Sequence, residues 1–177
     1  ETFINGKPCF VAGSTWPDGE KLICDYINSN PTSEIKYIIA PHSIKPDRIK
    51  ELIQNLRVEY ILFSDMKSKN LKNASVFIVD TIGLLSKIYS YGNLAYVGGA
   101  IGKTGLHNIL EPAVFGIPII IGKNHKKFPE AQVMINNGGV FQVETKDDFF
   151  KLMDSFLNDC NHAKKIGNLN KEFIKKN

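Results

Sequence analysis

Short runs of apolar residues, rich in valine, isoleucine and phenylalanine, alternate along the chain with longer stretches of helical character. The runs are nearly continuous rather than interrupted by polar residues, which is typical of strands with helices on both faces of their sheet. They predict strands at Cys9–Ala12, Tyr37–Ala40, Tyr60–Phe63, Val76–Val79, Leu94–Val97, Ile117–Ile121 and Val140–Val143. The stretches between them predict helices at Pro17–Ser29, Pro46–Gln54, Leu84–Tyr91, His107–Phe115, Phe128–Asn136 and Asp147–Leu157.

This order of strands and crossover helices predicts an α/β fold with a doubly wound, mainly parallel sheet of Rossmann-like topology. We expect residues 1–177 to form a single domain, with residues 158–177 as a carboxyl-terminal helical tail. Ligands of such folds bind outside the carboxyl ends of the strands. The loops that follow the strands are therefore the places to search for a binding site.

The composition is that of an ordinary globular protein and gives no sign of a membrane-spanning, secreted or metal-binding one. Hydrophobic residues make up 43% of the 177 residues, as in an ordinary globular domain. No apolar run approaches the ~18 to 20 residues that cross a bilayer, and the amino-terminal residues lack the layout of a signal peptide. The cysteines Cys9, Cys24 and Cys160 are odd in number and widely spaced. This usage suits a reducing cytosol and does not resemble a set of metal ligands.

The formal net charge of +4 is too modest to indicate a nucleic-acid partner. Basic residues do gather in the tail, at Lys164, Lys165, Lys171, Lys175 and Lys176. A solvated helix face explains such a cluster, and contact with an anionic membrane surface is the alternative.

The segment from Tyr96 to Gly122 carries the strongest indication of function. An apolar strand runs into a glycine-rich loop, then into a short helix with Glu111, and then into a second apolar strand. Glycines allow the backbone to approach a phosphate closely, and the N–H groups of a helix start favour negative charge. The segment therefore predicts a nucleotide-binding element.

Two familiar phosphate-binding motifs do not fit this loop. Gly102-Lys103-Thr104 resembles the end of a P-loop, but that motif requires glycine at the position of Val97. The glycines at 99, 102 and 105 also lack the spacing of the dinucleotide-binding fingerprint.

The quartet from Asn108 to Glu111 has two interpretations. One is a capping box, in which Asn108 caps the helix and Glu111 reaches back to it. The other places the Glu111 carboxylate on the two hydroxyls of a ribose. Both put Glu111 near a ligand at the helix start.

Three other loops carry distinctive residues at the same edge of the sheet. Ser14 and Thr15 follow the first strand, where either a helix cap or an anion site explains them. His42, after Pro41, is placed to stack on a base or to bind a phosphate, although a solvated loop histidine is the simpler interpretation. Gly83 opens a further helix whose N–H groups could read the edge of a ring, and an Asp80 or Thr81 cap is the alternative there.

Together these loops resemble one family, the 3-deoxy-D-manno-octulosonic acid (Kdo) transferases, which are two-domain glycosyltransferases of the GT-B type. The similar pieces run in the family's order over roughly residues 10 to 145. They are Gly13-Ser-Thr-Trp-Pro, Ala40-Pro-His-Ser-Ile, Asp80-Thr-Ile-Gly-Leu-Leu, Tyr91-Gly, Tyr96-Val-Gly-Gly-Ala, Gly105-Leu-His-Asn-Ile-Leu-Glu-Pro-Ala and Gly116-Ile-Pro-Ile-Ile-Ile-Gly. The resemblance covers the carboxyl-terminal half of such an enzyme, which binds the donor CMP-Kdo.

The resemblance implies a set of nucleotide-binding residues. They are Pro41, His42, Ile82, Gly83, Leu84, Asn108, Ile109, Leu110 and Glu111. Many relatives have glutamate where this chain has Leu84, so a contact there would use the backbone. Other residues of the same loops are weaker candidates, namely Ser14, Thr15, Lys103, Gly105 and His107.

The resemblance also implies a reaction: transfer of Kdo from CMP to a hydroxyl of a lipid A precursor in lipopolysaccharide biosynthesis. Backbone N–H groups would stabilise the charge that develops on the phosphate, and no metal or other cofactor is expected. The general base and the acceptor site would belong to an amino-terminal domain absent from this chain. The full-length enzyme would act in the bacterial cytoplasm at the inner membrane, whereas this chain alone would bind the donor without catalysis.

Two alternatives remain open at this point. Another GT-B enzyme, such as a UDP-sugar transferase or an epimerase, would share the glycine loop and Glu111. A non-catalytic nucleotide-binding module would also account for the α/β pattern and the basic tail.

Overall fold

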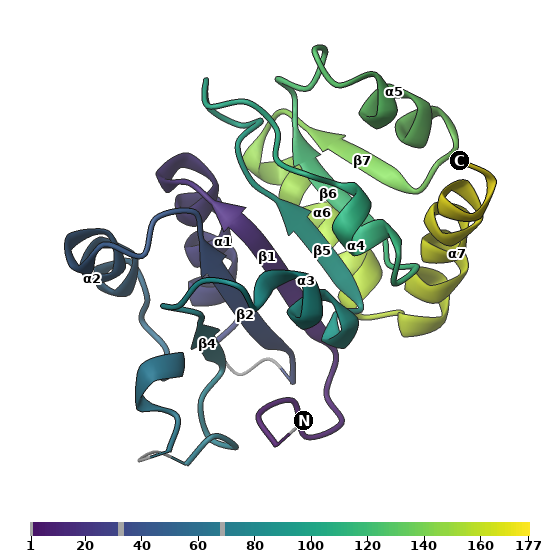
Figure 1. Cartoon of the computed structure of the whole chain (residues 1–177). Coiled ribbons are helices and arrows are strands. Elements are labelled where there is room, and N and C mark those ends of the chain that lie inside the picture. The colour runs from purple at the N-terminus through teal and green to yellow at the C-terminus, as the bar shows by residue number, and fades with distance from the viewer. Residues whose placement is uncertain (1, 32–33, 68–69) are drawn as a thin grey trace.

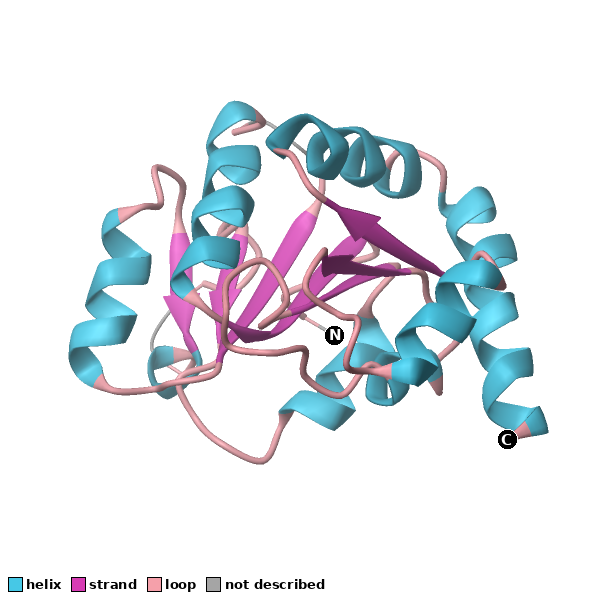
Figure 2. Cartoon of the chain, turned by 90° about the horizontal axis from the view of Figure 1, so that it is seen from above, coloured by secondary structure: helices cyan, strands magenta, loops and turns pink. Residues whose placement is uncertain are grey.

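The chain forms one parallel seven-stranded sheet with helices on both faces, in a computed structural model that describes residues 2–31, 34–67 and 70–177. Figure 1 shows the sheet crossing the molecule, and Figure 2 shows the helices covering its two faces. The strands lie in the order β3-β4-β2-β1-β5-β6-β7. Their bounds are β1 Cys9–Thr15, β2 Lys36–Pro41, β3 Tyr60–Leu62, β4 Val76–Ile78, β5 Leu94–Val97, β6 Ile119–Gly122 and β7 Val140–Val143.

The apolar side chains of the strands contribute to two layers, one on each face of the sheet. Phe10 and Ala12 of β1 face α1, α2 and α6, whereas Cys9 and Val11 face α3, α4 and α5. Burial of a large apolar side chain contributes about 1.5–3 kcal/mol, so both layers stabilise the sheet. The helices are α1 Pro17–Ser29, α2 Pro46–Gln54, α3 Leu85–Ile88, α4 Leu110–Ala113, α5 Pro129–Asn136, α6 Lys146–Leu157 and α7 Cys160–Lys176, with 3₁₀ turns η1 Phe63–Asp65 and η2 Tyr89–Tyr91.

The strands confirm the predicted α/β fold, and the predicted helical tail is present as α7. Asn170 anchors this helix: its side chain is buried and donates to the carbonyls of Ile117 and Gly139, each at 2.8 Å. Gly167 lies against the backbone of Gly116, where a Cβ would come within 2.0 Å of the Gly116 oxygen. The tail is therefore packed against the amino-terminal ends of β6 and β7.

Two helices are shorter than the sequence predicts. The helix expected over His107–Phe115 is only the four residues of α4, because the Asn108 side chain accepts the N–H of Leu110 at 3.0 Å and forms a turn there. Pro112 then lies within the first turn, where its missing N–H costs nothing. The helix expected over Leu84–Tyr91 is divided into α3 and η2.

The order of the strands determines where a ligand can bind. The chain proceeds from β1 to β2, β3 and β4 on one side of the sheet and then returns to β5 on the other side. The loops after β1 and β5 diverge from this point, so the crevice between their carboxyl ends is the expected ligand site of the fold. Among the described residues, no helix is long and apolar enough to cross a membrane.

Candidate functional site

Three aromatic rings from three different loops meet at the carboxyl edge of the sheet. Trp16 follows β1, His42 follows β2 and His107 follows β5. The rings of Trp16 and His42 are stacked, with centroids 4.5 Å apart and planes 20° apart. The His42 and His107 rings lie 4.7 Å apart. We call these three residues the ring cluster. His42 is its exposed member, and Trp16 and His107 are half-buried.

The contact between Trp16 and His107 defines the state of the histidine. The indole Nε1 of Trp16 donates to Nε2 of His107 at 3.0 Å. An indole N–H is only a donor, so Nε2 must be the acceptor and the neutral ring carries its proton on Nδ1. Burial, and to a lesser degree the nearby His42, lowers the pKa of His107 below its ordinary value of 6.5. The site therefore favours a neutral His107 that presents Nδ1–H.

The glycine-rich loop after β5 folds back tightly on itself. Gly99 has a φ of +100°, and a Cβ at this position would lie 1.7 Å from the carbonyl oxygen of Gly105. The Thr104 hydroxyl donates to the carbonyl of Gly99 at 3.0 Å. Only glycine permits such a close approach of two backbone segments. Within the described part of the chain, the backbone N–H groups from Gly99 to Leu106 donate to no other group.

The loop after β6 holds the glycine loop in place. The backbone N–H of Asn124 donates to Ala100, and its side-chain amide donates to the carbonyls of Ile101 and Gly102 at 3.2 and 2.8 Å. These contacts occupy carbonyl oxygens and leave the N–H groups free. Lys103, at the tip of the loop, is exposed. Sequence reasoning missed Asn124, because an asparagine in a polar loop carries no signal of its partner.

Asn108 and Glu111 are brought together, but not as a capping box. The Asn108 side-chain amide donates to the Glu111 carboxylate at 3.4 Å, while its oxygen accepts the N–H of Leu110. The residue at the helix start is Ile109, without a side-chain cap. Ile109 is buried, so only its backbone is available to a ligand, whereas Leu110 is 37% exposed.

The loop after β1 is built around a buried carboxylate. The Thr15 hydroxyl donates to Glu20 at 2.8 Å, and Glu20 also pairs with Arg48 of α2 at 3.5 Å. Burial raises the pKa of Glu20, and the contacts with Thr15 and Arg48 act in the opposite direction. The Thr15 carbonyl accepts the backbone N–H of His42 at 3.0 Å. Thr15 thus holds the loops of Trp16 and His42 together.

The backbone of Ser14 has an unusual conformation for this loop. Its φ is +49°, and a Cβ on Gly98 would lie 2.0 Å from the Ser14 carbonyl. The loops after β1 and β5 are therefore in close contact. Neither Ser14 nor Thr15 caps α1, since the residue at that position is Trp16 and its side chain makes no cap.

The residues after β4 form a separate, open loop. Ile82 is 81% exposed, and Gly83 has a φ of +84° with no atom within 4 Å of an added Cβ. Asp80 is not a helix cap, because its carboxylate accepts the backbone N–H and the hydroxyl of Ser64. In the described residues, no hydrogen bond or ring contact joins Ile82, Gly83 or Leu84 to the ring cluster.

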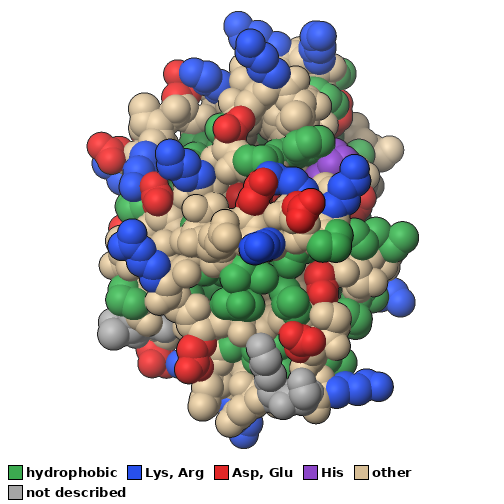
Figure 3. All heavy atoms as spheres, turned by 90° about the vertical axis from the view of Figure 1, so that its left-hand side faces the viewer, with side chains coloured by type: hydrophobic (Ala, Val, Ile, Leu, Met, Phe, Trp, Pro, Cys, Tyr) green, Lys and Arg blue, Asp and Glu red, His purple; other side chains and the backbone are tan. Residues whose placement is uncertain are grey.

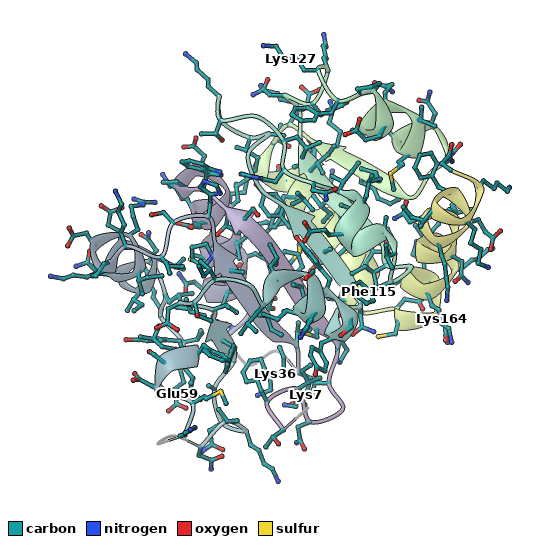
Figure 4. The ribbon with its side chains drawn as sticks, viewed as in Figure 1. Lys7, Lys36, Glu59, Phe115, Lys127 and Lys164 are labelled. Carbon is teal, nitrogen blue, oxygen red and sulfur yellow. The ribbon has the colours of Figure 1, made fainter. Side chains whose placement is uncertain are left out.

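The predicted site residues thus form two groups. One gathers Pro41, His42, His107, the glycine loop and Asn108–Glu111 around the switch between β1 and β5. The other, Ile82–Leu84, lies at the same edge but beyond β2. Figure 4 shows Lys127 above this edge and Glu59 at the opposite end of the sheet.

Curated bacterial proteins resemble nearly the whole of this chain. A bifunctional glycosyltransferase/methyltransferase of Fusobacterium nucleatum is 28% identical over 96% of the chain and 27% of its own length. A 3-deoxy-D-manno-octulosonic acid transferase of Rickettsia prowazekii is 30% identical over 92% of the chain and 36% of its own length. The chain is a relative of the Kdo transferases. No protein-family model matches it.

A solved structure also shares the fold. The carboxyl-terminal CMP-Kdo binding domain of WaaA from Acinetobacter baumannii has a TM-score of 0.83 at 20% identity, over 98% of this chain and 92% of that one. This likeness confirms the GT-B type of α/β fold that the sequence predicted. The chain spans well under half the length of the curated Kdo transferases that it matches, 36% and 41% for two of them.

Proposed function

We propose that the chain is the donor-binding domain of a Kdo transferase and binds CMP-Kdo at the carboxyl edge of its sheet. The observation that carries the proposal is the glycine loop, whose unengaged N–H groups from Gly99 to Leu106 lie at the switch between β1 and β5. Such donors suit the phosphate of a nucleotide. The relationship to Kdo transferases over 92% of the chain supports CMP-Kdo as the particular donor.

Each group of residues then has its own part in binding. Pro41 and His42 contact the nucleotide, and the backbone of Ile82–Leu84 reads the edge of the base. Asn108–Glu111 hold the ribose and the phosphate. Lys103, Gly105, His107 and Ser14 line the same crevice. The Thr15 hydroxyl donates to Glu20, and the Thr15 carbonyl accepts the backbone N–H of His42, so Thr15 positions His42 rather than contacting the ligand.

In the complete enzyme, residues 1–177 would supply the donor half of the active site. The N–H groups of the glycine loop stabilise the charge that develops on CMP as Kdo leaves, which is electrostatic catalysis by preorganised donors. The general base and the lipid A precursor belong to an amino-terminal domain. We propose that this enzyme acts at the cytoplasmic face of the inner membrane, with CMP-Kdo and the precursor as its substrates.

Calorimetric titration of the chain with CMP, UMP and UDP tests the proposal. CMP should bind more tightly than UMP and UDP. Glu111→Ala should weaken CMP binding about tenfold, because a charge-assisted hydrogen bond contributes roughly 1.5–3 kcal/mol. Glu59→Ala, at the opposite end of the sheet in Figure 4, should leave the affinity unchanged.

Two results of these titrations would contradict the proposal. UDP binding at least as tight as CMP binding would replace the Kdo transferase assignment with another GT-B enzyme. If Glu111→Ala and Gly83→Val both left nucleotide binding unchanged, the proposed site would be wrong and a different binding module would gain support.

A further inference from the structure

A second concave site lies on the sheet face that α3 and η2 cover. It is an apolar pocket of about 380 Å³ between the amino-terminal segment, η1, α3 and η2, with Ile38 of β2 and Phe77 of β4 at its floor. The helical segments on this face, α3 and η2, are shorter than a full crossover helix (Figure 1). Pockets of this size that are mainly apolar with a few polar groups are typical ligand sites.

The walls of the pocket are held by specific contacts. Phe3 packs against Phe77 with ring centroids 5.3 Å apart, and Phe63 meets Phe77 edge-on at 6.3 Å. The buried ammonium of Lys36 lies 5.0 Å from the centre of the Phe3 ring. Lys36 also donates to the carbonyls of Lys72 and Ala74. The amino-terminal segment is therefore fixed over the sheet, and the pocket is preformed. Figure 4 shows Lys36 beside this segment.

The polar groups at the pocket come from two consecutive short elements. Lys87 of α3 and Tyr91 of η2 both line it. Both are exposed, Tyr91 at 43%. Among the described residues, the Lys87 ammonium has no carboxylate or carbonyl partner. Of the described residues that line the pocket, Lys87 is the one that is charged, so the pocket combines apolar walls with a positive mouth.

We propose that this pocket binds a single alkyl chain that ends in an anionic group. The chain would lie on Ile38, Phe77 and Ile88, and the anionic end would meet Lys87, with the Tyr91 hydroxyl as a second donor. A lysine can pack its stem along apolar surface while its ammonium stays in water, and Lys87 combines exposure with a place in the lining, as a site for an amphiphile requires. Figure 3 shows apolar side chains gathered on the left-hand face of Figure 1, with charged groups around them.

The pocket is separate from the ring cluster but touches the proposed nucleotide site at one residue. Leu84 ends the loop of Ile82 and Gly83 and also lines the pocket. A bound alkyl chain would therefore contact the loop proposed to read the base. The pocket itself does not depend on the nucleotide assignment, because its walls belong to other elements.

Titration of the chain with monomeric dodecanoate, followed by methyl NMR and calorimetry, tests this proposal. We expect one-to-one binding, with shifts of the methyl signals of Ile4, Ile38 and Ile88. Dodecyltrimethylammonium, with the same tail and the opposite charge, should bind more weakly. Lys87→Gln should weaken dodecanoate binding about fivefold, the usual value of one exposed charge pair, and leave dodecanol binding unchanged.

One variant distant from the pocket and one that fills it test where the ligand binds. Lys164→Gln removes an exposed lysine of α7, far from the pocket in Figure 4, and should leave dodecanoate binding as it is. Leu71→Trp should fill the pocket and abolish binding, with CMP affinity and the melting temperature as controls for folding. If the wild-type chain bound CMP but not dodecanoate, the pocket proposal alone would be overturned.

Several results would contradict the proposal directly. Shifts confined to methyl groups outside the pocket would place the ligand elsewhere. Equal affinity for the cationic amphiphile would remove the role of Lys87. Association with anionic phospholipid vesicles in the absence of dodecanoate binding would assign the face to a membrane surface instead.

Discussion

Trp16 donates its indole N–H to Nε2 of His107 over 3.0 Å, although the two residues are 91 positions apart in the sequence. The bond joins the loops after β1 and β5 across the switch point of the sheet. It also selects which nitrogen of His107 can donate to a ligand.

Replacement of Trp16 by phenylalanine should release the tautomer of His107. The aromatic stack with His42 would remain, but the donor to Nε2 would be lost. We expect the ¹⁵N shifts of His107 to change from a protonated Nδ1 to a mixture of tautomers. CMP affinity should fall several-fold, since one hydrogen bond contributes about 0.5–1.5 kcal/mol. His162, which stacks on Phe156 in another part of the molecule, is the internal reference. An unchanged Nδ1–H signal would show that Trp16 does not select the tautomer.

Acidification should destabilise the chain through His107. Its pKa in the folded state lies below the ordinary value of 6.5, so the unfolded chain binds the proton first as the pH falls. The resulting stability is fully present above about pH 6.5 and is lost as the pH falls through the folded pKa. Urea unfolding of the wild-type chain and of His107→Gln should show this as a difference that shrinks with decreasing pH. A difference that stays constant from pH 8 to pH 5 would contradict the assignment.

Asn124→Ala should loosen the glycine loop without affecting the sheet. The variant removes the two side-chain bonds to Ile101 and Gly102, in an exposed part of the molecule. We expect a small loss of stability, about 1 kcal/mol, and a larger loss of CMP affinity, because the free N–H groups would no longer be preorganised. The ¹⁵N order parameters of residues 99–106 should fall. Lys127→Ala, in the same β6 loop, is the matched control and should change none of these quantities.

Asn170→Ala should destabilise the whole domain. Its amide satisfies the carbonyls of Ile117 and Gly139 inside the protein, and both would be left buried without this donor. The expected loss is about 2–3 kcal/mol in the free energy of unfolding. Asn168→Ala, on the exposed side of the same helix, should cost far less. Equal effects of the two variants in thermal unfolding would show that α7 is not anchored through Asn170.

The strands could be predicted because their apolar runs are continuous. Residues such as Val11 and Phe10 pack against helices on opposite faces, so neither face tolerates polar side chains. The bounds of the short helices α3 and α4 could not be predicted with the same accuracy. Asn108 closes a turn with its own side chain, and a local pattern does not reveal whether an asparagine caps a helix or delays its start.

The site could be predicted in outline but not in its contacts. The edge of the sheet follows from the strand order, and the loops that carry His42 and His107 bring these two rings together there. Trp16 was overlooked as a site residue. Its ring contacts with the two histidines depend on the order of β1, β2 and β5 in the sheet, which the local sequence does not give. The sequence also suggested that the Thr15 hydroxyl could bind an anion. In the structure this hydroxyl instead donates to the buried carboxylate of Glu20.

Trp16 is the one tryptophan of the sequence, and it lies in the ring cluster. The intrinsic fluorescence of the unlabelled protein is therefore a local signal from this edge of the sheet. Changes in its intensity report the positions of His42 and His107, and nucleotide binding can be followed without a dye. Loss of that signal during denaturation marks the separation of three loops, whereas circular dichroism follows the helices. The two methods together can distinguish opening of the site from unfolding of the domain.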